Sequence, residues 1–392
     1  MNLRQQKNNY CGQKLKTARI SNGYTLEELG GKLNISHQSV SKYEMGKAVP
    51  DIETQKKIAE ILGYSTTFFY GNEENLQIPQ GAHFFRSGAA VAKKYKDQVQ
   101  EKVKTIAYLI DYLESVLKLP PFKLDALFAT ETQFRQVNLN EIDDMAEKLR
   151  RFLGLGDGPI TNLTALCERL GIIVFSTVLD NEKIDACTVF YKNRPYILLN
   201  KDRISSVRLR FNIAHELGHI ILHSGYSEKD VKDKSKHKRI ELEANRFASS
   251  FLMPEAGIVP ELSSSGLDYL IILKEHWKTS IQSIVYRAEE LGIFTADYAL
   301  YLRQQISRKK WRKKEPLDDV LSIEEPKLIS QAIRLLTTKY KKSLDEISFN
   351  TGITVAELSN IAGIGLTKEE TLQYSKNYDN VVYISSHPNR NK

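Results

Sequence analysis

The amino-acid sequence predicts a mainly α-helical protein with a small sheet, an α+β fold divided among several domains. The chain has 392 residues. Since a domain takes about 150 residues, two or three domains are expected. Apolar residues recur at helical spacing over 12–71 and again over 89–118. One short, continuous apolar run, Tyr196–Leu199, is instead typical of a buried strand.

The composition is that of an ordinary protein that folds in water. Hydrophobic residues make up 41% and charged residues 27% of the chain, which excludes a disordered, collagen-like or membrane-embedded protein. The net charge of +8 permits an anionic partner without identifying one. The three cysteines are far apart, so neither a disulfide framework nor a four-cysteine zinc site is available. The polar N-terminus and the lack of long apolar runs predict a cytoplasmic protein with no membrane partner.

A helix is predicted to begin at Leu26. Thr25 and Glu28 form a capping box, in which each side chain accepts a hydrogen bond from the other residue's backbone N–H. The apolar periodicity that follows ends near Asn34. Gly30 lies inside this helix and should cost up to about 1 kcal/mol of helix stability relative to alanine.

A second short helix is predicted from His37 to Met45. Ser36 is a good N-cap for it, Gly46 supplies a permissive residue at its end, and Pro50-Asp51 begins a further helix. Two short helices joined by a tight turn allow the second to enter the major groove of DNA. Its polar residues would then face the DNA: His37, Gln38, Ser39 and Lys42.

The region 12–71 resembles the Xre or lambda-repressor-like family of helix-turn-helix proteins. The resemblance rests on four segments: Thr25–Leu29, Ile35-Ser36, Val40–Glu44 and Gly46. It implies a double-stranded DNA operator as partner, with His37, Gln38 and Ser39 at base edges and Lys42 on a phosphate or base. Gly30 stands where the family usually carries alanine. A helical protein-interaction module with a solvated polar helix is the alternative.

Residues 72–141 are predicted to form a linker and a coupling helix. The stretch 72–80 lacks periodicity and contains Pro79, which marks a domain boundary. The periodicity over 89–118 predicts one long amphipathic helix that ends at Pro120-Pro121. We interpret its lysines as a solvated face rather than a second DNA contact. A homodimer formed through this helix would match the two-fold symmetry of operators.

The strongest chemical signal is the pattern His-Glu-x-x-His at residues 215–219. The surrounding apolar pattern is helical, and residues four apart on a helix lie on the same face. His215 and His219 can therefore hold one metal ion, while Glu216 projects beside it. This geometry is typical of a metallohydrolase.

A second helix is predicted to supply the third metal ligand. In the stretch 238–247, Glu241 and Asn245 are four residues apart, so Glu241 could bind the metal while Asn245 orients a ligand imidazole. Glu243 remains the alternative ligand, because the rotation of this helix does not follow from the sequence. His223 lies too far along its own helix to share the ion, and we interpret it as a supporting or structural residue.

From about Ile142 to Leu302 the chain resembles the ImmA/IrrE-type metallopeptidase family, which has a zincin-like fold. Besides the histidine helix, the resemblance rests on these segments: 154–160, 184–186, 197–200, 208–211 and 241–254. It implies a zinc ion (Zn2+) as cofactor, with His215, His219 and Glu241 as ligands. It also implies Glu216 as the catalytic base.

Together these features predict a DNA-binding transcriptional regulator with a zinc-dependent endopeptidase that cleaves a protein, such as a repressor. If Tyr196–Leu199 is an edge strand beside the metal, it can pair with a substrate backbone, which favours a peptide substrate. One alternative is a non-proteolytic regulator whose metal domain senses or recruits. Another is a component of a toxin–antitoxin system. Non-haem iron also binds two histidines and a carboxylate, but those sites are usually built on strands.

The remainder of the chain carries weaker signals. The basic cluster 308–314 contains Trp311, which is expected to be buried while the lysines are solvated. Residues after 315 resemble a degenerate helix-turn-helix that serves protein contact or helix packing. The predicted parts of the chain are the helix-turn-helix domain 12–71, the linker and coupling helix 72–141, the metallopeptidase domain 142–314, the small helical C-terminal unit 315–374 and the mobile tail 375–392.

Overall fold

The described part of the chain is mainly helical and contains one four-stranded sheet, which confirms the predicted α+β class. The computed structural model describes residues 10–71, 84–85, 93–128, 131–177, 179, 185–200, 205–262 and 266–363. The predicted boundary at 72–80 and the predicted tail 375–392 lie outside these ranges. The chain divides into two compact units, of which the first comprises 1–77, 97–117 and 329–392 and the second 78–96 and 118–328.

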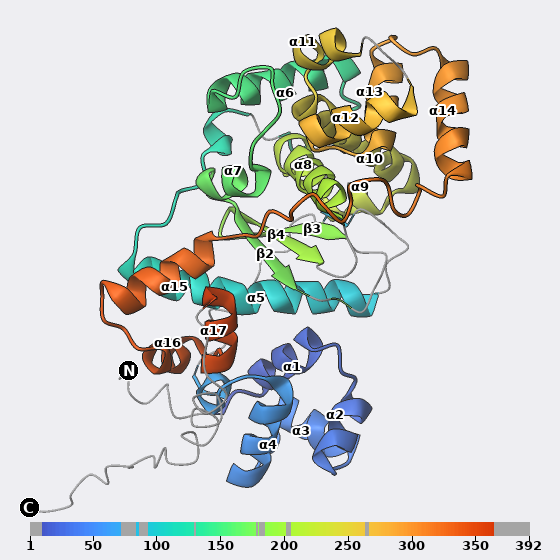
Figure 1. The fold of residues 1–392 in the computed structure, drawn as a ribbon. Helices are drawn as coiled ribbons and strands as arrows, with labels where there is room; N and C mark the ends of the chain where they lie inside the picture. Colours follow the sequence, from blue (N-terminus) through green and yellow to red (C-terminus); the bar gives the residue numbers. More distant parts are fainter. Residues whose placement is uncertain are drawn as a thin grey trace, which may run out of the picture. The chain divides into compact units, whose positions relative to one another are not determined.

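The first unit begins with four short α-helices (Figure 1). The four α-helices are α1 Gly12–Ser21, α2 Leu26–Leu33, α3 His37–Glu44 and α4 Ile52–Leu62. A 3-10 helix, η2 Thr66–Phe69, follows them. The capping box between Thr25 and Glu28 is present, and Asn34 ends α2 in the left-handed conformation with a φ of 57°. The predicted starts of α2 and α3 are therefore confirmed.

Helix α3 is attached to the first unit through its inner face. Val40 is fully buried in a core that also contains Leu15, Leu29 and Ile58. One turn further, Glu44 forms a buried ion pair with Arg19 of α1, in which the Nε–Oε1 distance is 2.6 Å. Because α3 is held on this side, its opposite face is left to solvent.

Gly30 is explained by the tight turn between α2 and α3. A Cβ atom at this position would lie 2.9 Å from the carbonyl oxygen of Ile35 and 3.2 Å from the backbone nitrogen of His37. Both are backbone atoms, which cannot rotate away as a side chain can. The glycine that lowers the helix propensity of α2 therefore permits the close approach of α3.

The C-terminal helices belong to the same unit as the helix-turn-helix, whereas the sequence predicted a separate unit at 315–374. These helices are α15 Leu328–Thr338, α16 Leu344–Thr351 and α17 Val355–Ala362. The backbone N–H of Ser65 donates to the Gly352 carbonyl over 2.9 Å. Gly352 has a φ of +75°, and a Cβ there would lie 2.5 Å from Cβ of Phe68. The predicted coupling helix is α5, Lys93–Val116, whose Thr105 lies 2.9 Å from the Tyr64 hydroxyl.

The second unit contains the sheet, whose strand order is β1-β3-β4-β2. Its strands are β1 Phe84–Phe85, β2 Ile173–Thr177, β3 Ala186–Tyr191 and β4 Arg194–Asn200. The predicted strand at Tyr196–Leu199 is confirmed, but it does not meet the condition for pairing with a substrate, because it is an inner strand and not an edge strand. It pairs antiparallel with β3 on one side and parallel with β2 on the other. A continuous apolar run suits this inner position, because such a strand is buried on both faces.

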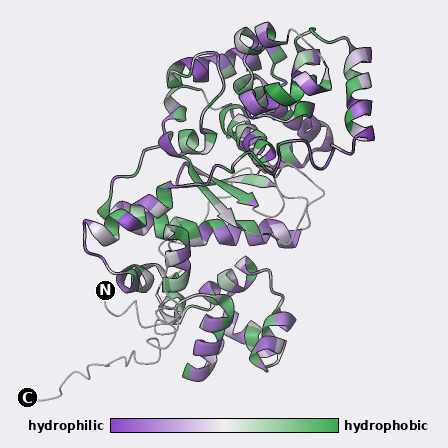
Figure 2. Ribbon diagram, in the orientation of Figure 1, coloured by the Kyte–Doolittle hydropathy of each residue, from purple (hydrophilic) through white to green (hydrophobic). Residues whose placement is uncertain are grey.

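Helix α8 lies in the middle of the second unit, where it packs against β3 and β4 on one side and against α10 on another (Figure 1). The helical elements of this unit are η5 Leu124–Ala126, α6 Leu139–Leu153, α7 Leu163–Arg169, α8 Ser206–Leu222, α9 Glu228–Lys232, α10 Lys234–Leu252, α11 Glu255–Ile258, η6 Val259–Glu261, α12 Leu267–Trp277, α13 Ile281–Glu290 and α14 Ala296–Arg308. Helix α10 packs alongside α8 and also contacts α6. Figure 2 shows the strands largely in the hydrophobic colours. No helix in the described ranges is long and apolar enough to cross a bilayer.

The segment after α14, residues 309–327, is anchored within the second unit by one aromatic side chain and by hydrogen bonds of two carboxylates. The lysine and arginine neighbours of Trp311 are exposed, as predicted, whereas Trp311 itself is only half-buried and packs against the main core. Glu315 accepts hydrogen bonds from the backbone N–H of Ile281 and from Lys274, whose ammonium group is buried. Glu324 accepts hydrogen bonds from the first turn of α7. These carboxylates satisfy N–H groups at the starts of two helices.

We predict that Gly30→Ala destabilises the first unit by about 1–3 kcal/mol, because the new methyl group overpacks the turn into α3. Gly31→Ala is the matched control, since a Cβ at that position would have no atom within 4 Å apart from its chain neighbours and the backbone of its own helix. It should stabilise the unit by up to about 1 kcal/mol through helix propensity. Amide hydrogen exchange across α2 and α3 in the full chain measures both changes. Equal stabilisation by the two variants would contradict the steric explanation.

Candidate functional site

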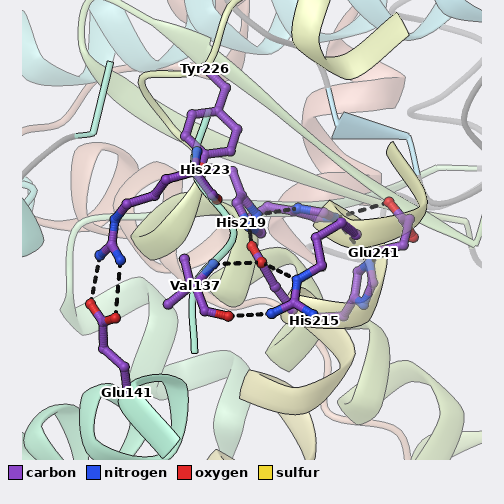
Figure 3. Close-up of polar contacts among 10 residues, drawn as sticks. Val137, Glu141, His215, His219, His223, Tyr226 and Glu241 are labelled. Carbon is purple, nitrogen blue, oxygen red and sulfur yellow. Dashed lines mark hydrogen bonds and ion pairs between the residues drawn. The ribbon is translucent and has the colours of Figure 1, made fainter. Parts of the chain in front are cut away.

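Two imidazoles and one carboxylate converge in the interior of the second unit. His215 and His219 are fully buried on α8, and their Nε2 atoms are 3.0 Å apart. Oε2 of Glu241 on α10 lies 3.4 Å from Nε2 of His215, and its Oε1 lies 3.4 Å from Nε2 of His219. Figure 3 shows the three side chains facing one another. One ligand atom from each lies within 4.8 Å of the others.

The spacing of these atoms fits a small tetrahedral ion. Zinc–ligand bonds of about 2.0–2.1 Å place neighbouring ligand atoms roughly 3.3–3.4 Å apart. The two nitrogens are 3.0 Å apart, and each has an oxygen of Glu241 at 3.4 Å, Oε2 beside His215 and Oε1 beside His219, so these separations are close to that range. Two nitrogens and one carboxylate are also the donor set of many catalytic zinc sites, in which a water takes the fourth position. The residues therefore fit a zinc ion.

Asn245 orients the first of the two imidazoles. Its amide oxygen lies 2.9 Å from Nδ1 of His215. An amide oxygen only accepts, so Nδ1 of His215 carries the proton and Nε2 presents its lone pair to the cluster. This is the arrangement proposed from the spacing of Glu241 and Asn245 in the sequence.

Glu243, the alternative third ligand, lies outside the cluster. It is fully buried, and its Oε2 atom lies 3.0 Å from Nε2 of His223. Its Oε1 atom accepts hydrogen bonds from the backbone N–H of Val137 and from Nε of Arg239. His223 in turn contacts His219, with 3.0 Å between their Nδ1 atoms. The two carboxylates of α10 thus contact different histidines: Glu241 contacts His215 and His219, and Glu243 contacts His223.

Burial and neighbouring groups shift the ionisation of residues around the cluster. Burial alone would raise the pKa of Glu241, but contacts with His215 and His219 hold that pKa below its usual value. Burial lowers the pKa of His223 to about 4, so this imidazole is neutral near pH 7. Burial also raises the pKa of Cys187, and the nearby Glu216 adds to this effect. Cys187 is therefore a thiol and is a poor metal ligand.

Glu216 follows His215 directly in the chain but does not belong to the ligand cluster. Its side chain is 1% exposed, and its Oε2 atom accepts a hydrogen bond of 2.6 Å from the hydroxyl of Thr188 on β3. Thr188 has no local signal in the sequence, because it lies far from the histidine motif and carries no motif of its own. The same holds for Val137. The Arg239–Glu243 pair has a local signal, because residues four apart on a helix are neighbours.

The four residues predicted to face DNA lie on α3 with unequal exposure. His37, Gln38 and Lys42 are exposed, whereas Ser39 is half-buried. The Ser39 hydroxyl lies 3.0 Å from the hydroxyl of the N-cap residue Ser36, and its backbone N–H donates to the same atom. The exposed face of α3 therefore presents an imidazole, an amide and an ammonium group.

Two family models match parts of the chain. Residues 15–69 match the helix-turn-helix model, and residues 167–289 match the IrrE N-terminal-like domain of the Peptidase_M78 type. The chain combines a helix-turn-helix domain with an IrrE-like domain. Both resemblances identified from sequence motifs are confirmed. The residues of α3 lie inside the first match, and the three converging side chains lie inside the second.

Two relatives from Bacillus subtilis resemble a short part of the chain. The SPbeta prophage-derived uncharacterized HTH-type transcriptional regulator YonR is 46% identical over 57 residues, which is 14% of this chain and 53% of that protein. The HTH-type transcriptional regulator ImmR is 38% identical over 63 residues, which is 16% of this chain and 50% of that protein. The chain thus spans about half the length of these curated relatives.

Proposed function

We propose that this protein is a DNA-binding transcriptional regulator that carries a zinc-dependent endopeptidase. The observation that carries the proposal is the convergence of His215, His219 and Glu241, with the buried carboxylate of Glu216 on the residue next to His215. The match of the surrounding residues to an IrrE-like domain supports the hydrolase, and the helix-turn-helix domain supports the regulator.

The DNA partner is a double-stranded operator that α3 contacts in the major groove. The exposure of Gln38 and Lys42 supports this role. A glutamine amide can make two hydrogen bonds to an adenine edge, which distinguishes adenine from other bases. A lysine on a phosphate adds affinity with little sequence preference. The names of the two Bacillus subtilis relatives, both HTH-type transcriptional regulators, agree with this proposal.

In the hydrolase domain, His215, His219 and Glu241 would hold the zinc ion. When bound, zinc lowers the pKa of a coordinated water and polarises a carbonyl group. Glu216 then acts as the general base: its carboxylate accepts the proton of the attacking water and delivers it to the leaving amine. The Thr188 hydroxyl donates to one oxygen of Glu216 and so restricts how that carboxylate can turn.

The proposed substrate is a protein, such as a repressor. The inner position of β4 removes the argument that this strand pairs with a peptide, since both of its edges are already hydrogen-bonded. The substrate class therefore rests on the likeness to an IrrE-like domain and on the choice of ligands. A homodimer formed through α5 stays a prediction.

We predict one zinc ion per chain, lost from His215→Ala, His219→Ala and Glu241→Ala after mild chelation. His276→Ala is the control, because His276 is exposed and pairs with Glu261 outside the cluster. Zinc affinity should also fall as the pH is lowered, since protons compete with the metal for the imidazoles. Elemental analysis of the purified chain measures both effects. Stoichiometric zinc in His215→Ala would refute the ligand assignment.

We predict that Gln38→Ala weakens specific operator binding by about 1–3 kcal/mol, because a base contact is lost. Lys42→Ala should instead weaken binding to specific and random duplexes by similar amounts. Binding titrations at fixed salt, with a duplex selected from a random pool and with an unselected duplex, separate the two cases. Equal losses on both duplexes for Gln38→Ala would remove Gln38 from base readout.

We predict that Glu216→Gln lowers proteolysis by at least about 100-fold, because the amide cannot accept the proton of water. Zinc content and DNA binding should be unchanged, since Gln has nearly the same size and Glu216 is outside the ligand cluster. Cleavage of a co-expressed repressor measures the loss. If the regulatory response survives Glu216→Gln but is lost in His215→Ala, the metal domain is a sensor and the peptidase proposal fails.

A further inference from the structure

We propose that Glu243 and His223 are positioning residues that hold the proton of His219 on Nδ1 and so keep Nε2 of His219 available to the metal. The inference rests on the proposed zinc site and adds to it a buried relay behind one ligand. The three side chains are fully buried: His219 lies on α8, His223 is the residue that follows the last residue of α8, and Glu243 lies on α10.

The relay is a continuous line of short contacts. Oε2 of Glu243 lies 3.0 Å from Nε2 of His223, and Nδ1 of His223 lies 3.0 Å from Nδ1 of His219. The other ring nitrogen of His219, Nε2, faces His215 and Glu241. In Figure 3, His223 lies between Tyr226 and His219, on the side of His219 away from Glu241.

The direction of each hydrogen bond follows from the donors and acceptors. A carboxylate only accepts, so Nε2 of His223 donates to Glu243. A neutral imidazole has a single N–H, which leaves Nδ1 of His223 as an acceptor. Nδ1 of His219 must then be the donor across the Nδ1–Nδ1 contact. The remaining nitrogen of His219, Nε2, therefore carries a lone pair and can bind a cation.

Neighbouring donors fix the orientation of the Glu243 carboxylate, so that one of its oxygens accepts the hydrogen bond from His223. Its Oε1 atom accepts from the backbone N–H of Val137 at 2.9 Å and from Nε of Arg239 at 2.6 Å. Arg239 also donates to the carbonyl of Val137, which fixes the guanidinium on the segment before α6. Two donors occupy Oε1, and Oε2 is left to face His223.

The other histidine ligand, His215, is oriented by a single amide side chain. Asn245, which is exposed, accepts from Nδ1 of His215 and sets the same tautomer. An amide can turn over and offer its NH2 group, whereas a carboxylate offers an acceptor from either oxygen. The buried ligand His219 is thus oriented by a group that cannot reverse its hydrogen bond.

The decisive variant is Glu243→Gln, which keeps size and shape but can reverse the relay. Val137 and Arg239 both donate, so the amide oxygen should turn towards them and the NH2 group towards His223. His223 would then accept on Nε2 and donate from Nδ1, and the proton of His219 would move to Nε2. We expect zinc affinity to fall about 10–100-fold, measured in the full chain by competition with a chelating dye.

Glu290→Gln is the matched control. Glu290 is a carboxylate of the same unit that also contacts arginine, through Arg246 and Arg287, and accepts from Ser249. It has no contact with the imidazoles among these interactions, so its variant should keep the zinc affinity of the unaltered chain. A loss of zinc affinity in Glu243→Gln but not in Glu290→Gln supports the relay. Unchanged affinity in Glu243→Gln, or an equal loss in Glu290→Gln, overturns it.

A second measurement needs no substitution and so does not depend on the folding of a variant. Nitrogen-15 NMR of histidine-labelled protein, with and without zinc, reports which ring nitrogens carry protons. The relay requires protons on Nε2 of His223 and Nδ1 of His219, and a proton on Nδ1 of His223 overturns it. Neither measurement uses peptide cleavage. Failure of the peptidase proposal therefore leaves the result for the relay intact.

Discussion

Helix α8 carries His215, Glu216 and His219 in a fully buried segment, where a polar group without a hydrogen bond costs about 1–3 kcal/mol. In the second unit, neighbouring elements lower this cost because they supply hydrogen-bond partners to the buried polar side chains. Helix α10 lies alongside α8 and brings Glu241 and Asn245 to its histidines and Glu243 to His223, just after the end of α8. Strand β3 brings the Thr188 hydroxyl to Glu216. The same contacts between elements therefore build the cluster and supply hydrogen-bond partners to several of its buried polar atoms.

The rotation of α10 separates its neighbouring residues into different surroundings. Glu241 faces the imidazoles and its side chain is 17% exposed, Leu242 is 44% exposed, and Glu243 is fully buried. Successive helical residues differ by about 100° in direction, so two carboxylates two residues apart cannot serve the same point. One carboxylate meets the ligand nitrogens and the other meets the histidine behind them. This division gives each acidic residue of α10 a separate electrostatic role.

In the first unit, helix α3 exposes polar side chains on one face while its other face is packed against the rest of the unit. Val40 and the Arg19–Glu44 ion pair hold the inner face of α3, and the close turn at Gly30 sets its distance from α2. Breaking a buried pair by removing one partner is costly, since an uncompensated charge remains. The exposed residues of α3 can therefore vary in sequence without loosening the helix, which suits a surface that reads a ligand.

The sequence by itself determined the features that depend on residues a few positions apart. The capping box at Thr25, the N-cap at Ser36 and the shared face of His215 and His219 are interactions within one or two helical turns. Only the tertiary structure decided which carboxylate of α10 joins the histidines and that β4 is an inner strand. Helix rotation and strand order arise from packing between segments far apart in the chain, and no local pattern records them.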